Sequence, residues 1–248
     1  MPAPRSRVSS RHPPGGDELE RAFEFIRLAD MFGTREARSR MGTAVLTPEL
    51  PLRLDSNYLL VDPVPRDVEA PAVAAEADHV LGGAGLRQRC VMLRDAGAGE
   101  RLAPGFVSLG WDVFRGLVMA LRRPPERMVD TSLVERTDAA TLRPARAQQL
   151  RGYPWATPEV IRQLLDARAL APVPTQHFAI FDAGRPVAWA ELYVQGSVAQ
   201  VEAVATAATH RRRGHASALI VRAASTATAR GAGLVFLCAD AADWPRHL

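Results

Sequence analysis

One stretch in the C-terminal half of the chain decides the fold: Val201-Glu202-Ala203-Val204-Ala205-Thr206-Ala207-Ala208-Thr209-His210-Arg211-Arg212-Arg213-Gly214-His215-Ala216. Its start is typical of a strand and its end of a helix, so the arginines and the glycine form a tight strand-to-helix turn. Such a turn leaves unpaired N–H groups pointing at one spot, where the helix dipole favours negative charge. Gly214 and Ala216 are small enough for a phosphate to approach the backbone. The stretch predicts a phosphate-binding turn; the alternative is a surface turn with solvated arginines.

The segments around this turn follow a regular order. The pattern predicts, in chain order, a strand at 132–136, a helix at 139–150, a helix from Pro158, strands at 178–181, 187–193 and 198–206, a helix at 216–230 and a buried strand at 234–238. Thr157-Pro158 is an N-cap followed by proline at the first helical position. Gly184 supplies the positive φ that a short hairpin turn needs, and Gly231 ends the last helix.

The turn and this order together resemble the GNAT superfamily of N-acetyltransferases. The coenzyme A motif of that family is Arg or Gln, two variable residues, Gly, one variable residue, then Gly or Ala; Arg211, Gly214 and Ala216 match it. The resemblance covers residues 132–238 and implies an α/β fold, with a mixed, mostly antiparallel sheet flanked by helices, that uses acetyl-CoA as cosubstrate. Fingerprints of nucleotide hydrolysis or of a dinucleotide site are absent from the sequence.

The resemblance also implies the site residues. In the family the pantetheine arm lies along the strand before the turn, and the pyrophosphate lies on the turn and the helix start. In this chain the implied cofactor contacts are Val204, Ala205 and Thr206 on the strand, and Arg211, Arg212, Arg213, Gly214, His215, Ala216 and Ser217 after it. Glu202 resembles a general base found on this strand in some members. The alternative is a structural glutamate, because a bulge can reverse the face on which it lies.

The chain divides into three predicted regions. Residues 1–16 are a disordered tail, residues 17–127 a degenerate GNAT-like α/β half, and residues 130–248 a GNAT acyl-CoA-binding domain that lacks its final strands. A charged, proline-rich break, Arg122-Arg123-Pro124-Pro125-Glu126, separates the two halves. In the first half we expect one helix from Asp17 to near Arg40, strands at 57–61, 87–93 and 113–121, and helices at 67–81 and 100–109. That order is similar to the second half of a GNAT domain, without a glycine-bearing phosphate turn, so we expect no cofactor there.

The family sequence normally continues beyond the strand at 234–238 into a tyrosine-bearing segment and two more strands, which are not found before Leu248. The tyrosine is the family's acid for the thiolate, so two functional classes stay open. One is an active acyl-CoA-dependent N-acetyltransferase, completed by the N-terminal half or by a second subunit in a homodimer. The other is an inactive acyl-CoA-binding or interaction protein. We also expect the strand at 234–238 to be covered, because a bare apolar edge promotes aggregation. The N-terminal half is favoured as the cover, since it costs no association entropy.

The amino-acid composition restricts the kinds of partner that we expect for this protein. The 248 residues are 47% hydrophobic and 23% charged, which is ordinary for a globular protein without membrane spans or a signal segment, so we expect a cytoplasmic location. The net charge of +4 comes from arginines spread along the chain with few aromatic neighbours, which disfavours nucleic acid as a partner. Cys90 and Cys238 do not make a metal site, and we expect both to be core residues. The acceptor is a small-molecule or peptide amine that the sequence does not identify.

Overall fold

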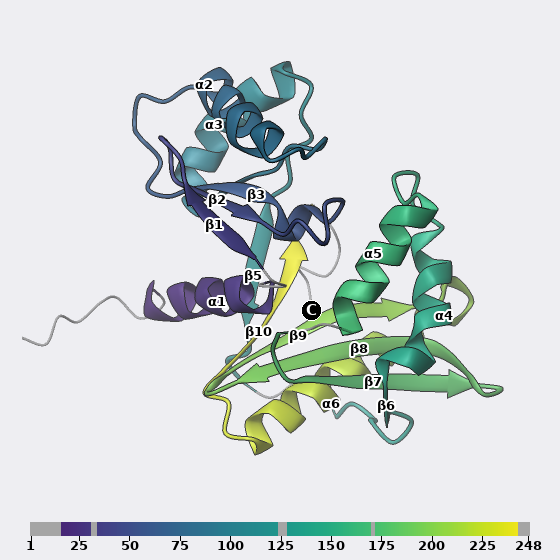
Figure 1. Cartoon of the computed structure of the whole chain (residues 1–248). Helices are drawn as coiled ribbons and strands as arrows, with labels where there is room; N and C mark the ends of the chain where they lie inside the picture. The colour runs from purple at the N-terminus through teal and green to yellow at the C-terminus, as the bar shows by residue number, and fades with distance from the viewer. Residues whose placement is uncertain (1–15, 31–33, 124–127, 170–171, 243–248) are drawn as a thin grey trace, which may run out of the picture.

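The computed structural model describes residues 16–30, 34–123, 128–169 and 172–242. All but the last residue of the predicted tail lies outside these ranges, as do Pro124, Pro125 and Glu126 of the predicted break and the chain after residue 242. Within them the chain forms two sheets flanked by helices (Figure 1). The α/β class, with a mixed and mostly antiparallel main sheet, is confirmed.

The main sheet has six strands in the order β5-β10-β9-β8-β7-β6. Their bounds are β5 Gly116–Ala120, β6 Glu135–Thr137, β7 Thr175–Asp182, β8 Arg185–Gln195, β9 Val198–Thr206 and β10 Leu234–Asp240. All neighbours pair antiparallel except β9 and β10, which run parallel because the helix α6 (His215–Ala229) connects them as a crossover. The predicted order of elements in this half is therefore confirmed.

Helices cover both faces of the main sheet (Figure 1). Helix α6 packs on one face, where Leu219 and Ala223 contact the apolar side chains of β7, β8 and β9. The helices α4 (Ala139–Leu150), α5 (Pro158–Ala169) and α1 (Gly16–Ala29) lie on the opposite face. There Leu142 of α4 packs on Trp189, and Phe25 of α1 packs on Phe236.

Local sequence signals set the ends of these elements. The Asp138 side chain accepts the N–H of Thr141 at 2.7 Å and caps α4, and the Thr157 hydroxyl accepts the N–H of Val160 at 3.3 Å and caps α5. The β7–β8 turn consists of Ala183 and Gly184, with φ of 47° and 75°. Both predicted features, the Thr157 cap and the glycine-bearing hairpin, are confirmed.

The N-terminal half forms a second sheet in the order β1-β2-β3-β4. Its elements are β1 Arg35–Arg38, β2 Thr43–Leu46, the 3-10 helix Leu54–Ser56, β3 Tyr58–Val61, α2 Ala70–Ala77 with a π-helical extension Asp78–Gly82, β4 Val91–Leu93 and α3 Ala96–Ser108. β3 and β4 are parallel and joined through α2, as β9 and β10 are joined through α6. The origin of this half as a degenerate tandem copy, and the domain bounds, stay predictions.

The predicted helix from Asp17 to Arg40 is wrong at its C-terminal end. Helix α1 ends at Ala29, and Arg35–Arg38 is a strand paired with β2. The hairpin returns through Gly42, where a Cβ atom would lie 2.0 Å from the carbonyl oxygen of Leu60. This close backbone approach requires glycine, and the strand is held by pairing with a later segment, which the local helical spacing does not report.

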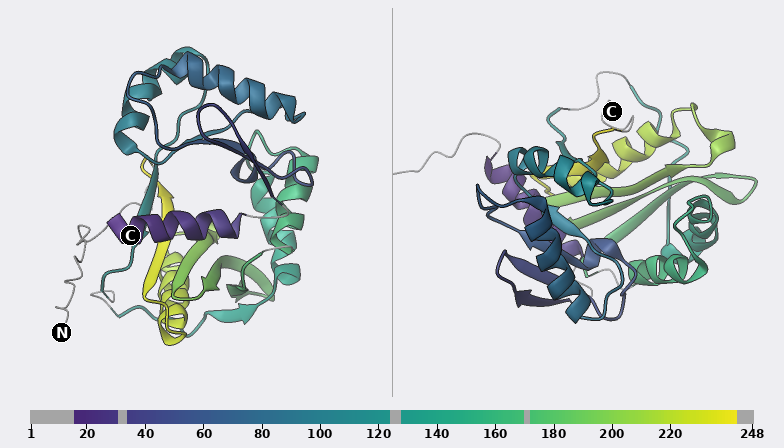
Figure 2. Two further views of the ribbon diagram at one scale, coloured as in Figure 1. Left: turned by 60° about the vertical axis from the view of Figure 1, so that its left-hand side comes forward. Right: turned by 90° about the horizontal axis from the view of Figure 1, so that it is seen from above.

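The N-terminal half covers the edge of the main sheet, as expected. β5 pairs antiparallel with β10, with Val118 opposite Cys238, and so adds a strand from the first half to the sheet of the second. Helix α1 crosses β10 on one face, where the rings of Phe25 and Phe236 meet edge to face at 5.9 Å (Figure 2). The two halves therefore share one sheet, and β10 has hydrogen-bonded neighbours on both sides.

Candidate functional site

The parallel strands β9 and β10 separate partway along their length. They pair from Val198 opposite Leu234 to Val201 opposite Leu237. Beyond this point β9 continues to Thr206 and β10 to Asp240 without pairing to each other. The strands diverge at Glu202, which leaves the backbone of residues 202–206 without a strand on its β10 side.

A bulge in β9 coincides with this divergence. Ala205 lies opposite Trp189 and Glu202 lies opposite Glu191, so two residues of β9 oppose the single residue Ala190. Ala203 has φ of 53°, the left-handed value typical of a distorted strand. The bulge follows Glu202, whose register opposite Glu191, the partner of Arg146 on α4, places it on the face of the sheet that α4 covers.

The strand after the bulge offers backbone groups to the gap. The N–H of Ala207 donates to the carbonyl of Val187 at 2.8 Å, which fixes the alternation of the ladder. The backbone groups of Ala205, opposite Trp189, are therefore turned toward β8. Those of Val204 and Thr206 alternate with it and face the gap.

The predicted phosphate turn has the geometry of an anion site. After the 3-10 helix Ala208–His210, Arg212 and Gly214 take left-handed conformations with φ of 63° and 80°. The first helical bond runs from the N–H of Ala218 to the carbonyl of Gly214, and no side chain caps α6. The N–H groups of His215, Ala216 and Ser217 therefore have no carbonyl of α6 to pair with, at the positive end of the helix dipole. Arg211 to Gly214 are exposed.

Two of the three arginines are tied to the turn by their own side chains. Arg211 Nε donates to the carbonyl of Thr206 at 3.3 Å, and Arg213 Nη2 donates to the carbonyl of Thr209 at 3.2 Å. These bonds keep both positive charges beside the helix start, where an anion would lie. The structure thus brings the predicted turn residues together at the end of the β9 strand.

A buried polar cluster on the α4 face was not predicted from the sequence. Glu191 of β8 is fully buried and forms an ion pair with Arg146 of α4. The hydroxyl of Tyr193 donates to Glu191 Oε2 at 2.6 Å, and His177 Nδ1 lies 3.4 Å from Glu191 Oε1. The signal was present in the sequence, because Glu191 is the one charged residue in the apolar strand segment 186–194.

Glu202 lies beside this cluster. Its Oε2 accepts the side-chain N–H of Gln200 at 2.8 Å. Burial raises the pKa of the Cys238 thiol, and the charge of Glu202 across the diverging strands raises it further. Cys238 was expected in the core and is exposed on β10, while Cys90 is half-buried. Cys238 lies two residues beyond Phe236, which α1 covers, and it lines an open hollow at the end of β10, so solvent reaches it.

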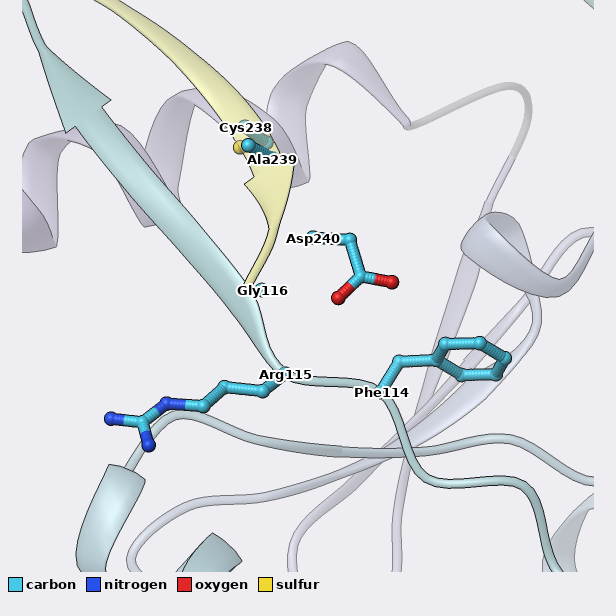
Figure 3. A pocket seen from close by; sticks show the side chains of 6 residues that line it. All are labelled: Phe114, Arg115, Gly116, Cys238, Ala239 and Asp240. Atoms are coloured by element: carbon cyan, nitrogen blue, oxygen red, sulfur yellow. The ribbon is translucent and has the colours of Figure 1, made fainter. Parts of the chain in front are cut away.

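A surface hollow of about 310 Å³ lies at the end of β10, next to Cys238. None of the turn residues 211–217 is among the residues that line it. Its lining comprises Phe114, Arg115, Gly116, Cys238, Ala239 and Asp240. Figure 3 shows Arg115 and Phe114 pointing to opposite sides of it, with the Asp240 carboxylate between them. It is open and shallow, so we do not place the cofactor there.

Among the described residues, the histidines, cysteines and carboxylates form no cluster of three that could hold a metal ion. A search of the same residues for a helix long and apolar enough to cross a membrane found none.

Comparison with known proteins agrees with this geometry. Residues 140–245, which contain the diverging strands and the turn, match the model of the acetyltransferase (GNAT) family. The segment is less than half of the chain. No curated protein sequence matches the chain.

Solved structures with a similar fold include a GCN5-related N-acetyltransferase from Kribbella flavida, at 18% identity and TM-score 0.58 over 91% of this chain and 86% of that one. A functionally unknown conserved protein from Staphylococcus epidermidis ATCC 12228 is similar at 13% identity and TM-score 0.57, over 87% of each chain. A putative acetyltransferase from Novosphingobium aromaticivorans DSM 12444 matches at 19% identity and TM-score 0.39, over 53% of this chain and 54% of that one. At these identities the likeness of the first two establishes the fold, including that of the N-terminal half.

Proposed function

We propose that the chain is an acetyl-CoA-dependent N-acetyltransferase that acts on an amine. The observation that carries the proposal is the conjunction of diverging parallel strands, a bulge at Ala203 and an uncapped helix start at His215, all within the GNAT domain. The free amides of His215, Ala216 and Ser217, flanked by Arg211 and Arg213, suit a pyrophosphate in charge and hydrogen-bonding direction.

The cofactor's remaining length fits the gap beside β9. An amide-bearing arm laid along residues 204–206 would find the backbone groups of Val204 and Thr206 facing it, spaced two residues apart as a strand partner requires. The thioester then falls near the bulge, next to Glu202. Acetyl-CoA supplies the activated acyl group when it is bound.

Glu202 is the residue placed to accept a proton from the attacking amine. It lies on β9 at the point of divergence, it is partly exposed, and it faces the side of the sheet from which an acceptor would approach, opposite α6. A carboxylate there would also attract a cationic amine. Its bond from Gln200 orients the carboxylate and favours one rotamer.

That same bond supports the second candidate, an acyl-CoA-binding protein without turnover, in which Glu202 is a structural partner of Gln200. The two functions share the cofactor site and differ in chemistry. A measurement of the free thiol released from acetyl-CoA in the presence of several amines distinguishes the two functions. A binding protein should release no more thiol than a sample that contains acetyl-CoA and amine without protein.

Titration with acetyl-CoA tests the shared claim. A ligand that binds only the folded state at one hundred times its dissociation constant adds about 2.7 kcal/mol to the free energy of unfolding, and so raises the melting temperature. We expect this rise with acetyl-CoA and with CoA. An unchanged melting temperature at millimolar concentrations of both would remove the proposal.

A further inference from the structure

The tip of the β7–β8 hairpin contacts the segment that leads into the phosphate turn. Asp182 is the last residue of β7, and its Oδ2 lies 2.9 Å from Nε2 of His210, the last residue of the 3-10 helix before Arg211. The other ring nitrogen, Nδ1, lies 2.9 Å from the hydroxyl of Thr209. The imidazole, 17% exposed, is therefore held on both sides.

Both partners of this contact are fixed at their backbones. Asp182 pairs with Arg185 across the two-residue turn of the hairpin. The N–H of His210 donates to the carbonyl of Ala207 at 2.8 Å, and the N–H of Ala207 donates in turn to Val187 of β8. The side-chain bond closes a second connection between the hairpin and the turn, in addition to the β8–β9 ladder.

The phosphate turn needs such a support. It is exposed, and it contains two left-handed residues, of which Arg212 is not glycine, so its conformation is unfavourable in an isolated peptide. Neither Arg211 nor Arg213 anchors the turn to the hairpin by a hydrogen bond, because both guanidinium groups bond to carbonyls of their own segment. His210 immediately precedes these residues and reaches outside the segment.

The charges near the contact are complementary. The hydrogen bond from His210 lowers the pKa of Asp182, and the charges of His210 and Arg213 lower it further, so the carboxylate stays ionised. Asp182 faces His210 from the hairpin, and Arg213 faces the pair from the turn.

We propose that Asp182 and His210 are a positioning pair, which holds the phosphate turn in its anion-binding conformation and so raises the affinity for the cofactor's pyrophosphate. The inference rests on the proposed function, because it takes residues 211–217 as the pyrophosphate site. Neither residue touches the ligand in this role; both act through the backbone of the turn.

A double-mutant cycle on the full chain tests the pair. The dissociation constant of CoA is measured by calorimetry for the wild type, Asp182→Asn, His210→Gln and the double variant. An exposed charge pair is worth up to about fivefold in an equilibrium constant, so we expect each single variant to bind CoA about three- to fivefold more weakly and the double variant no worse than either. Asp166→Asn, which removes a carboxylate bonded to Arg143 and Arg162 on the opposite face, is the control and should bind as the wild type does.

A second measurement needs no ligand. Amide hydrogen exchange of residues 208–217 should be faster in Asp182→Asn than in the wild type and in Asp166→Asn, while exchange in β8 stays unchanged. Equal exchange in all three proteins overturns the inference even if CoA binds. If exchange is faster in Asp182→Asn and the wild type does not bind CoA, the pair does support the turn. The proposed function and the link to the pyrophosphate are then overturned.

Discussion

Glu202 of β9 lies directly opposite Glu191 of β8, at the register pair that adjoins the bulge, and the two carboxylates have different partners. Glu191 is fully buried against Arg146 and Tyr193, whereas Glu202 is partly exposed and bonded by Gln200 at the divergence of β9 and β10. The two glutamates therefore differ in role because they differ in position: Glu191 is a structural carboxylate, and Glu202 is a candidate base.

Replacement of Glu202 tests the base. Glu202→Gln keeps the shape and the contact with Gln200 and removes the proton acceptor, and loss of a general base typically lowers turnover ~10²- to 10⁴-fold. We expect a fall in the rate of thiol release with little change in the dissociation constant of CoA. A fall under about threefold would assign Glu202 a structural role.

The buried pair should show the opposite behaviour. Glu191→Gln leaves Arg146 buried beside a neutral group, and removal of one partner of a buried ion pair costs about 3–5 kcal/mol of unfolding free energy. Denaturant unfolding measures it. Replacing both residues by apolar ones, as in Arg146→Met with Glu191→Leu, should recover part of the loss; a loss in Glu191→Gln below about 1 kcal/mol would mean that the pair contributes little.

Two glycines that flank α6 form a matched test of the phosphate site. Gly214 at the N-terminus and Gly231 after the C-terminus have φ of 80° and 86°, and a Cβ atom at either would meet no atom within 4 Å. Aspartate at either position therefore carries a similar backbone cost of about 1–2 kcal/mol. Gly214→Asp should abolish the rise in melting temperature caused by CoA, because it places a negative charge at the pyrophosphate position, and Gly231→Asp should retain it. Equal CoA affinity in the two variants would show that the turn is not the site.

The shared sheet predicts the behaviour of a truncated chain. Without residues 1–127, β10 loses β5 and the cover of Phe25, which exposes Phe236 and a row of unpaired backbone groups. We expect an aggregated or oligomeric fragment by size-exclusion chromatography with light scattering. A monomeric fragment that binds CoA with full affinity would contradict this.

A single substitution tests the same strand pairing in the full chain. Met119→Pro removes a backbone N–H of β5 that points toward β10, opposite Leu237, and should lower the melting temperature. Thr131→Pro, in the described segment before β6, lies outside the sheet and serves as the comparison. An equal melting temperature in the two variants would indicate that β5 contributes little to the stability of β10.

The sequence alone determined the parts of this protein whose signals are local. The cap at Thr157, the glycine of the β7–β8 turn and the strand-to-helix turn through Gly214 each follow from the conformational preferences of a few neighbouring residues. These signals were enough to predict the order of elements in the C-terminal half and the position of the strand-to-helix turn.

Only the tertiary structure decided the features that depend on distant partners. The strand Arg35–Arg38 forms because β2 pairs with it, and β5 joins the second half's sheet because β10 offers an open edge. The register of β9 against β8 sets the face of Glu202, and Glu191 is buried because Arg146, on a helix earlier in the chain, compensates its charge. Hydrogen bonds and ion pairs of this kind form between residues far apart in the sequence, so no local pattern reports them.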